Sequence, residues 1–167
     1  MKNKITLFLI LSFSALLFAQ CNKEEEAMGA DLELFNLATA TTGFSWFQTD
    51  SIRASSNPSA HNAYMRVRFN QTAAAILGSD GKLPVGASFP NGSLIVKELY
   101  DSPTGSLQLY AIMQKDSTDS NAGANWLWAE IKPDSKVVFS VSEKGDGCTG
   151  CHGSTPNRDF SRVFDQF

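Results

Sequence analysis

The sequence predicts an α+β fold that is mostly β, with an N-terminal helix, an antiparallel sheet, short connecting helices and a distinct C-terminal segment. Three observations support this prediction. Apolar residues between 31 and 42 have helical spacing, whereas segments from Met65 onward alternate or are rich in β-branched residues. Loops that contain Gly, Pro and Ser separate those segments. Strands that follow one another without long helices between them favour an antiparallel sheet.

The individual elements follow from these patterns in chain order. A helix is expected over 31–42, a loop over 49–60 and a short helix over 71–77. The expected strands are 65–69, 93–100, 107–115, 126–131 and 137–141. Polar and Gly-rich loops are expected at 79–91 and 116–124, and Ser102-Pro103-Thr104-Gly105 predicts a turn. This turn would join the second and third strands into a hairpin.

The N-terminus has the features of an export signal. Lys2 and Lys4 precede an apolar run that ends at Ala19. This run is shorter than the roughly 20 residues that a membrane span needs. Phe18-Ala19-Gln20-Cys21 is similar to a bacterial lipobox, which predicts that Cys21 carries lipid. Gln20 departs from the small residue that normally precedes this cysteine, so cleavage by the ordinary signal peptidase is the alternative.

The expected organisation is a lipoprotein-type signal peptide at 1–20, an acidic tether at 21–30 and one domain at 31–167. It predicts a protein of the cell envelope that is anchored to a membrane by lipid and is either periplasmic or surface-exposed. The formal net charge is −3, and the chain has no basic stripe. A nucleic acid partner is therefore excluded.

The segment Gly147-Cys148-Thr149-Gly150-Cys151-His152 contains Cys-x-x-Cys-His, the signature of c-type haem attachment. Two thiols at this spacing can add to the two vinyl groups on one porphyrin edge, while the adjacent imidazole reaches the iron. The motif predicts one haem c, attached covalently through Cys148 and Cys151, with His152 as the iron ligand. Export agrees with this prediction, because c-type attachment takes place outside the cytoplasm.

Two other chemistries fit part of this motif. A zinc site would need four ligands from Cys148, Cys151, His152 and one more residue, and His61 is the only other histidine. A redox disulfide between the two cysteines would call for a thioredoxin-like βαβ setting, which a strand-rich chain does not provide. Haem attachment is the interpretation that the spacing and the predicted export favour.

The position of the motif bears on the sixth iron ligand. Only 15 residues follow His152, and none of them is Met. A methionine ligand would have to be Met65 or Met113, which are expected to pack on strand faces. We therefore expect a five-coordinate iron that binds or transforms a small molecule. The alternative is a six-coordinate electron-transfer cytochrome; a redox partner protein is expected in either case.

A second pattern runs from His61 to the C-terminus. It combines residues 89–98, Phe-Pro-Asn-Gly-Ser-Leu-Ile-Val-Lys-Glu, with the later haem motif. The other contributing residues are His61, 65–70, Ala73, Met113, Lys115, Asp116, 126–128, Asp159, Phe160, Val163 and Phe164. Together these segments resemble the cytochrome P-460 family, which includes the cytochromes c′-beta.

The resemblance implies a β-rich homodimer with His152 as the proximal ligand and an exchangeable distal face. In hydroxylamine-oxidising members a strand lysine bonds to a meso carbon of the haem, and Lys97 matches it; relatives without this bond bind nitric oxide and other gases. From the residues themselves, Lys97 shares an apolar strand face with Ile95 and Leu99, which favours the neutral amine. Its ammonium group could instead reach solvent or pair with a haem propionate.

The hydroxylamine-oxidising members also use a distal carboxylate for proton transfer. When the segments are registered on Lys115-Asp116, this position is Ala111. Alternation places Leu107, Leu109, Ala111 and Met113 on one face. An apolar face there predicts ready nitric oxide binding and weak hydroxylamine oxidation.

Four further polar side chains are candidates for the site. Glu130 could supply the missing acid, or it could be a solvated or salt-bridged side chain. Arg66 and Arg68 share a strand face and could bind haem propionates, or they could face solvent. His61 is expected in a loop or as a supporting residue beside the site, with a distal ligand as the alternative.

Overall fold

The structure is a computed structural model, and it describes residues 25–56, 61, 64–154 and 158–165. The predicted signal peptide and Cys21 lie outside the described residues. Within the described part of the chain, no helix is both long and apolar enough to cross a membrane.

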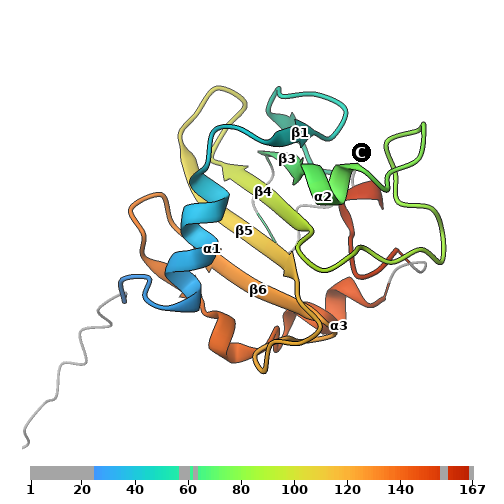
Figure 1. Cartoon of the computed structure of the whole chain (residues 1–167). Coiled ribbons are helices and arrows are strands. Elements are labelled where there is room, and N and C mark those ends of the chain that lie inside the picture. The colour runs from blue at the N-terminus through green and yellow to red at the C-terminus, as the bar shows by residue number, and fades with distance from the viewer. Residues whose placement is uncertain (1–24, 57–60, 62–63, 155–157, 166–167) are drawn as a thin grey trace, which may run out of the picture.

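An antiparallel sheet of seven strands forms the centre of the described chain (Figure 1). The strands are β1 (Phe44–Trp46), β2 (Arg53–Ala54), β3 (Tyr64–Asn70), β4 (Leu94–Tyr100), β5 (Leu107–Lys115), β6 (Trp126–Ile131) and β7 (Val137–Phe139). Their spatial order is β1-β3-β4-β5-β6-β7, and β2 pairs with β3 beside β1. The predicted α+β, mostly β fold is confirmed.

The helical elements are short except for the first. They are α1 (Ala30–Thr39), α2 (Gln71–Ala74) and α3 (Cys148–His152), with 3-10 turns η1 (Val141–Glu143) and η2 (Val163–Asp165). Helix α1 lies across one face of the sheet over β5 and β6 (Figure 1). The longest helix covers this face, whereas α2, the loop before β4 and the C-terminal segment pack on the other face.

Each face of the sheet has its own apolar core. Leu34 and Ala38 of α1 are buried in the first core, together with Leu94, Val96, Ile112, Leu127, Ala129 and Ile131. The second core contains Phe69, Ile95, Met113, Trp126 and Trp128, which pack with Phe164 of the C-terminal segment. Alternation along each central strand therefore sends neighbouring side chains into different cores.

The long central elements match their predicted bounds, and the short ones do not. β5 and β6 have the predicted ends, β4 begins one residue later than predicted, and β3 is longer by one residue at each end. β7 stops at Phe139, because Ser140 and Glu143 form a capping box that starts η1. α2 ends at Ala74, three residues earlier than predicted, and β1 and β2 were not predicted.

The acidic tether is shorter than predicted, because packed structure begins before residue 30. The backbone of Glu25 accepts a hydrogen bond from the Val137 amide at 2.9 Å, and the Ala27 amide donates to Ser135 at 2.8 Å. Ala27 is buried, and the Glu26 carboxylate forms an ion pair with Lys136. The folded part of the described chain thus includes residues assigned to the tether.

Candidate functional site

A cavity of about 220 Å³ lies between the second face of the sheet and the C-terminal segment. The sheet lines it with Val67, Ile95, Lys97, Ala111, Met113, Trp128, Glu130 and Phe139. The loop side contributes His61, Cys148, Cys151, His152, Arg162 and Val163. The predicted haem motif, Lys97 and Glu130 are therefore brought to one cavity.

Strand register explains why Lys97 and Glu130 share this cavity. Lys97 lies opposite Ala111, and Ala111 lies opposite Glu130. Residues directly opposite one another in antiparallel strands share a face. Ala111 has the smallest side chain of the three, so it leaves space between the charged groups. The pairing also extends to Val67 and Phe139, and we call these five residues the cavity row.

The cavity row corrects the expectation of a purely apolar face. Leu99 pairs with Leu109, but Tyr100 pairs with Leu107, because the register shifts between Leu99 and Tyr100. This irregularity breaks the alternation that was expected to place Leu107 with Ala111. Of the four residues expected on one face, only Ala111 and Met113 line the cavity, and Glu130 adds a carboxylate beside them.

Burial governs the charges of the polar groups in the cavity. It lowers the pKa of Lys97 to about 8, although Glu130 opposes this shift. Burial also raises the pKa of Glu130, against the effect of Lys97. The Glu130 side chain is half-buried, at 25% exposure, and lies beside His61. A half-buried amine and a half-buried carboxylate thus influence each other across Ala111.

His61 lies beside Glu130, with its Nδ1 3.6 Å from a Glu130 carboxylate oxygen. Burial, Lys97 and His152 together lower the pKa of His61 to about 3, so the imidazole is neutral near pH 7. His61 also lines the cavity, and its role as a supporting residue or as a distal ligand stays a prediction.

Helix α3 and the turn that follows it orient His152. Its Nδ1 is 2.8 Å from the Phe160 carbonyl oxygen. A carbonyl oxygen can only accept, so Nδ1 carries the proton and Nε2 keeps its lone pair. Burial lowers the pKa of His152 to about 4, which keeps the ring neutral. A neutral imidazole whose other nitrogen donates to a carbonyl is the form that binds metals.

Trp128 packs against His152 and is itself held by a close backbone approach. The Trp128 and His152 ring centroids are 4.9 Å apart, in an edge-to-face arrangement. Gly145 has φ of +69°, and a Cβ there would come within 2.5 Å of the indole. Only glycine fits both the conformation and the contact.

The two cysteines of the motif are free thiols. Burial raises the pKa of Cys148 to about 11, whereas Cys151 is exposed and its Sγ lies 3.1 Å from Arg162 Nη1. The described residues contain no cluster of three or more His, Cys, Asp or Glu side chains that could hold a metal ion. The zinc and disulfide alternatives therefore gain no support from the geometry.

Comparison with known families agrees with this geometry. A model of the Cytochrome P460 family matches residues 44–164, most of the chain. The chain belongs to the cytochrome P460 family. It is therefore a c-type haem cytochrome, and haem c is the cofactor that the family implies. A search of curated proteins finds no match.

The residues of this cytochrome P460 cavity fit a haem. Free thiols at Cys148 and Cys151 can form thioethers, and the His152 Nε2 can bind iron. Arg162 contributes a buried Nε without a hydrogen-bond partner. A buried donor of this kind is costly unless an acceptor reaches it, and an anionic porphyrin carries such acceptors.

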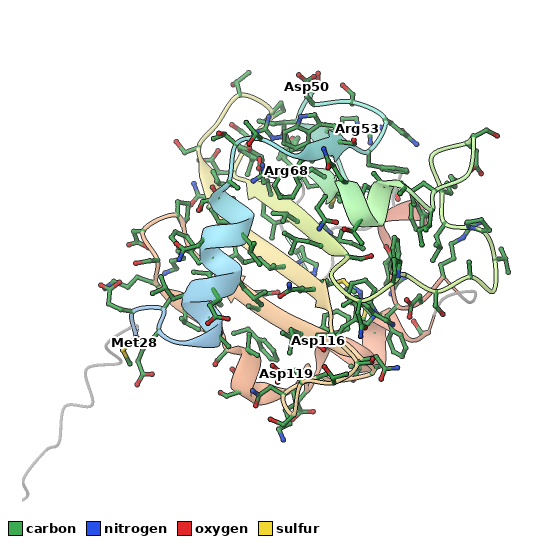
Figure 2. The ribbon with its side chains drawn as sticks, viewed as in Figure 1. Met28, Asp50, Arg53, Arg68, Asp116 and Asp119 are labelled. Atoms are coloured by element: carbon green, nitrogen blue, oxygen red, sulfur yellow. The ribbon has the colours of Figure 1, made fainter. Side chains whose placement is uncertain are left out.

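Arg66 and Arg68 are not brought to the cavity, which corrects their expected role as propionate ligands. Arg66 Nε lies 2.6 Å from one Glu98 oxygen, and Arg68 Nε lies 3.1 Å from the other. Arg68 also donates to the carbonyls of Ala38 and Ala40 at the end of α1, where Figure 2 labels it. Its residue exposure of 6% also rules out a solvent face for Arg68.

Three contributors to the site were missed in the sequence. The Phe160 carbonyl is a backbone group, so its contact with His152 cannot be predicted from residue type. Arg162 follows the haem motif at a distance that has no characteristic spacing. Trp128 and Glu130 are two residues apart in β6, and this spacing on one strand face was the one signal that could have placed Trp128 beside the site.

Proposed function

We propose that this cytochrome P460 protein is a mono-haem cytochrome that binds a small nitrogen or oxygen species, nitric oxide in particular, at a five-coordinate iron. When bound, the haem supplies an iron that exchanges small ligands and passes single electrons. The observation that carries the proposal is the cavity row, which places Ala111 between Lys97 and Glu130 in the cavity that holds the haem motif.

The side chains that could act as a sixth iron ligand have other contacts, which supports an open coordination position. Met65 is fully buried and does not line the cavity. Met113 lines it but is 8% exposed and packs in the second core with Phe69 and Ile95. His61 directs Nδ1 toward Glu130. Each of these side chains thus has a partner or a packing role already.

The first test enlarges Ala111. We expect Ala111→Leu to keep its haem but to bind nitric oxide more weakly, because the larger side chain fills the space between Lys97 and Glu130. Adding one methylene to a pocket changes discrimination by about 10–200-fold, so a loss of at least roughly tenfold is expected. Titration of the ferrous protein with nitric oxide measures the affinity.

The matched control is Ala38→Leu, which adds the same volume to the core under α1, where Ala38 is 0% exposed. It should lower Tm by overpacking and leave nitric oxide affinity unchanged. Equal nitric oxide affinities for the wild type and Ala111→Leu would contradict the proposed binding position.

Hydroxylamine oxidation is a second candidate, and the position of Glu130 favours it. This oxidation releases protons as well as electrons, so it needs a proton acceptor. Glu130 can accept a proton from a substrate in the cavity, and the neutral His61 imidazole lies beside it. Lys97 keeps a half-buried amine in the same row, with its pKa lowered to about 8 by desolvation. Its cross-link to the haem stays a prediction, and a red-shifted ferrous band that Lys97→Ala abolishes would be its sign.

We also propose that Cys21 is lipidated and anchors the protein at the cell envelope. The apolar run before Cys21 and the acidic residues after it support this proposal. Two or more acyl chains give stable anchoring, whereas one is marginal. Wild type should fractionate with membranes and Cys21→Ala should be soluble; identical soluble behaviour of both would count against lipidation. The homodimer and the redox partner protein stay predictions.

A further inference from the structure

We propose that the buried Lys115–Asp159 ion pair is a clamp that positions the Phe160 carbonyl and thereby tunes how strongly His152 donates to the haem iron. The inference rests on His152 as the iron ligand. Lys115 and Asp159 are positioning residues, because they act through Phe160 and do not line the cavity.

The clamp is built from two fixed carboxylate contacts. Lys115 Nζ lies 2.7 Å from Asp159 Oδ1, and both side chains are nearly buried, at 7% and 8% exposure. The other oxygen, Oδ2, accepts a hydrogen bond from the Phe89 amide at 2.8 Å. Asp159 is thus held both by the end of β5 and by the loop that leads into β4.

The lysine is also fixed. Its Nζ lies 4.9 Å from the centroid of the Trp126 ring, and Trp126 is fully buried. A desolvated ammonium over an aromatic face is attracted to it. The charged end of Lys115 therefore has little freedom to follow Asp159 if that residue moves.

The backbone at the clamp needs such support. Asp159 has φ of 49° and Phe160 has φ of 64°, a left-handed conformation that is unfavourable for residues other than glycine. Such conformations persist where the surrounding structure over-determines them. Arg158 contributes by donating to the Leu83 carbonyl, and the Ser161 amide donates to the Arg158 carbonyl at 3.0 Å. The ion pair is the charged part of this support.

The Phe160 carbonyl transmits the clamp to His152. It accepts from Nδ1 at 2.8 Å, and hydrogen bonding at this nitrogen raises the basicity of Nε2. A more basic imidazole binds iron more strongly and stabilises the ferric state. When the clamp is weakened, the carbonyl relaxes, the hydrogen bond lengthens and the ferrous state is favoured.

The test uses Asp159→Asn in the full-length holoprotein. The neutral amide keeps the shape of the side chain and removes the charge that faces Lys115. We expect a lower iron–histidine stretching frequency in the ferrous protein and a shift of the ferric/ferrous equilibrium toward ferrous by about tenfold, which is ~59 mV for one electron. Lys115→Met should shift both quantities in the same direction.

Glu98→Gln is the matched control, because Glu98 is an equally buried carboxylate in ion pairs on the opposite face of the sheet. It should lower Tm without changing the stretching frequency or the potential. Asp159→Glu keeps the charge and can be measured if the neutral variants lose haem. Its longer side chain should still shift the iron–histidine stretching frequency.

Two results would overturn the clamp. If Asp159→Asn, or Asp159→Glu where the neutral variants lose haem, lowers Tm but leaves frequency and potential at the wild-type values, the ion pair is only structural. If the wild-type ferrous protein has no iron–histidine band at all, it has no five-coordinate iron bound by His152, and the proposed open site fails together with the clamp. A band that is present and shifts in the Asp159 variants but not in Glu98→Gln supports both.

Discussion

Replacing Cys148 and Cys151 together with serine should release the haem from the denatured protein. Both thiols line the cavity, and neither is in a disulfide. Serine keeps the size of each side chain but cannot form a thioether. The haem of the wild type should stay with the denatured chain through acid–acetone extraction, whereas the colour of the double variant should leave with the solvent.

Thr149→Ser is the control, since Thr149 lies between the two cysteines in α3 and has no thiol. It should retain its haem as the wild type does. Extraction of the haem from the wild-type protein would contradict covalent attachment, and full retention by the double serine variant would show that a bond other than the two thioethers, such as one to Lys97, holds the haem.

Glu130→Gln should have the largest effect on hydroxylamine oxidation. A positioned base typically contributes about 10²–10⁴ in rate, so the variant should lose roughly this factor if the protein oxidises hydroxylamine. Nitric oxide affinity should change little, because binding an uncharged gas transfers no proton. Steady-state oxidation with an artificial electron acceptor measures the rate.

The pH dependence provides a second measure of the same role. A base must be ionised to accept a proton, and burial raises the pKa of Glu130 above its ordinary value of 4.5. The rate should therefore rise as pH increases through that raised pKa, and Glu130→Gln should remove the rise.

Glu98→Gln, on the other face of the sheet, should oxidise hydroxylamine as the wild type does while losing stability. Rapid turnover by the wild type that Glu130→Gln does not slow would show that the proton acceptor lies elsewhere. Unmeasurable turnover by both proteins would leave nitric oxide binding as the function and remove Glu130 from a catalytic role.

The sequence predicted the central strands well because their patterns are long. β5 and β6 have nine and six residues, and apolar runs of this length stand out between polar loops. β1 and β2, with three and two residues, exist through their pairing with β3, and so short a segment has no readable period. The pairing of β1 and β2 with β3 cannot be inferred until the position of β3 in the sheet is known.

Which face a side chain occupies was harder to predict. Arg66 and Arg68 were correctly expected on one face of β3, but alternation alone does not say which core that face meets. Their partner Glu98 is on β4, opposite Arg66. The two arginines thus form ion pairs with this buried carboxylate and not with a haem propionate.

The position of the Glu130 carboxylate in the cavity depends on the register between strands. Ala111 was correctly recognised as lacking a carboxylate, but its neighbour across the sheet is Glu130. A slip of one residue would have turned Glu130 away, so its position cannot be derived from β6 alone. The haem motif needed no such information, because its three functional residues lie within five consecutive positions of the chain.

The visible spectrum of the purified ferrous holoprotein, before and after nitric oxide is added, tests the central claim most directly. A high-spin five-coordinate spectrum that nitric oxide converts readily to a nitrosyl spectrum is the predicted result. It would show that the cavity beside Lys97, Ala111 and Glu130 leaves an iron position open. A low-spin six-coordinate spectrum of the His/Met type that nitric oxide does not change would contradict it and would identify an electron-transfer cytochrome instead.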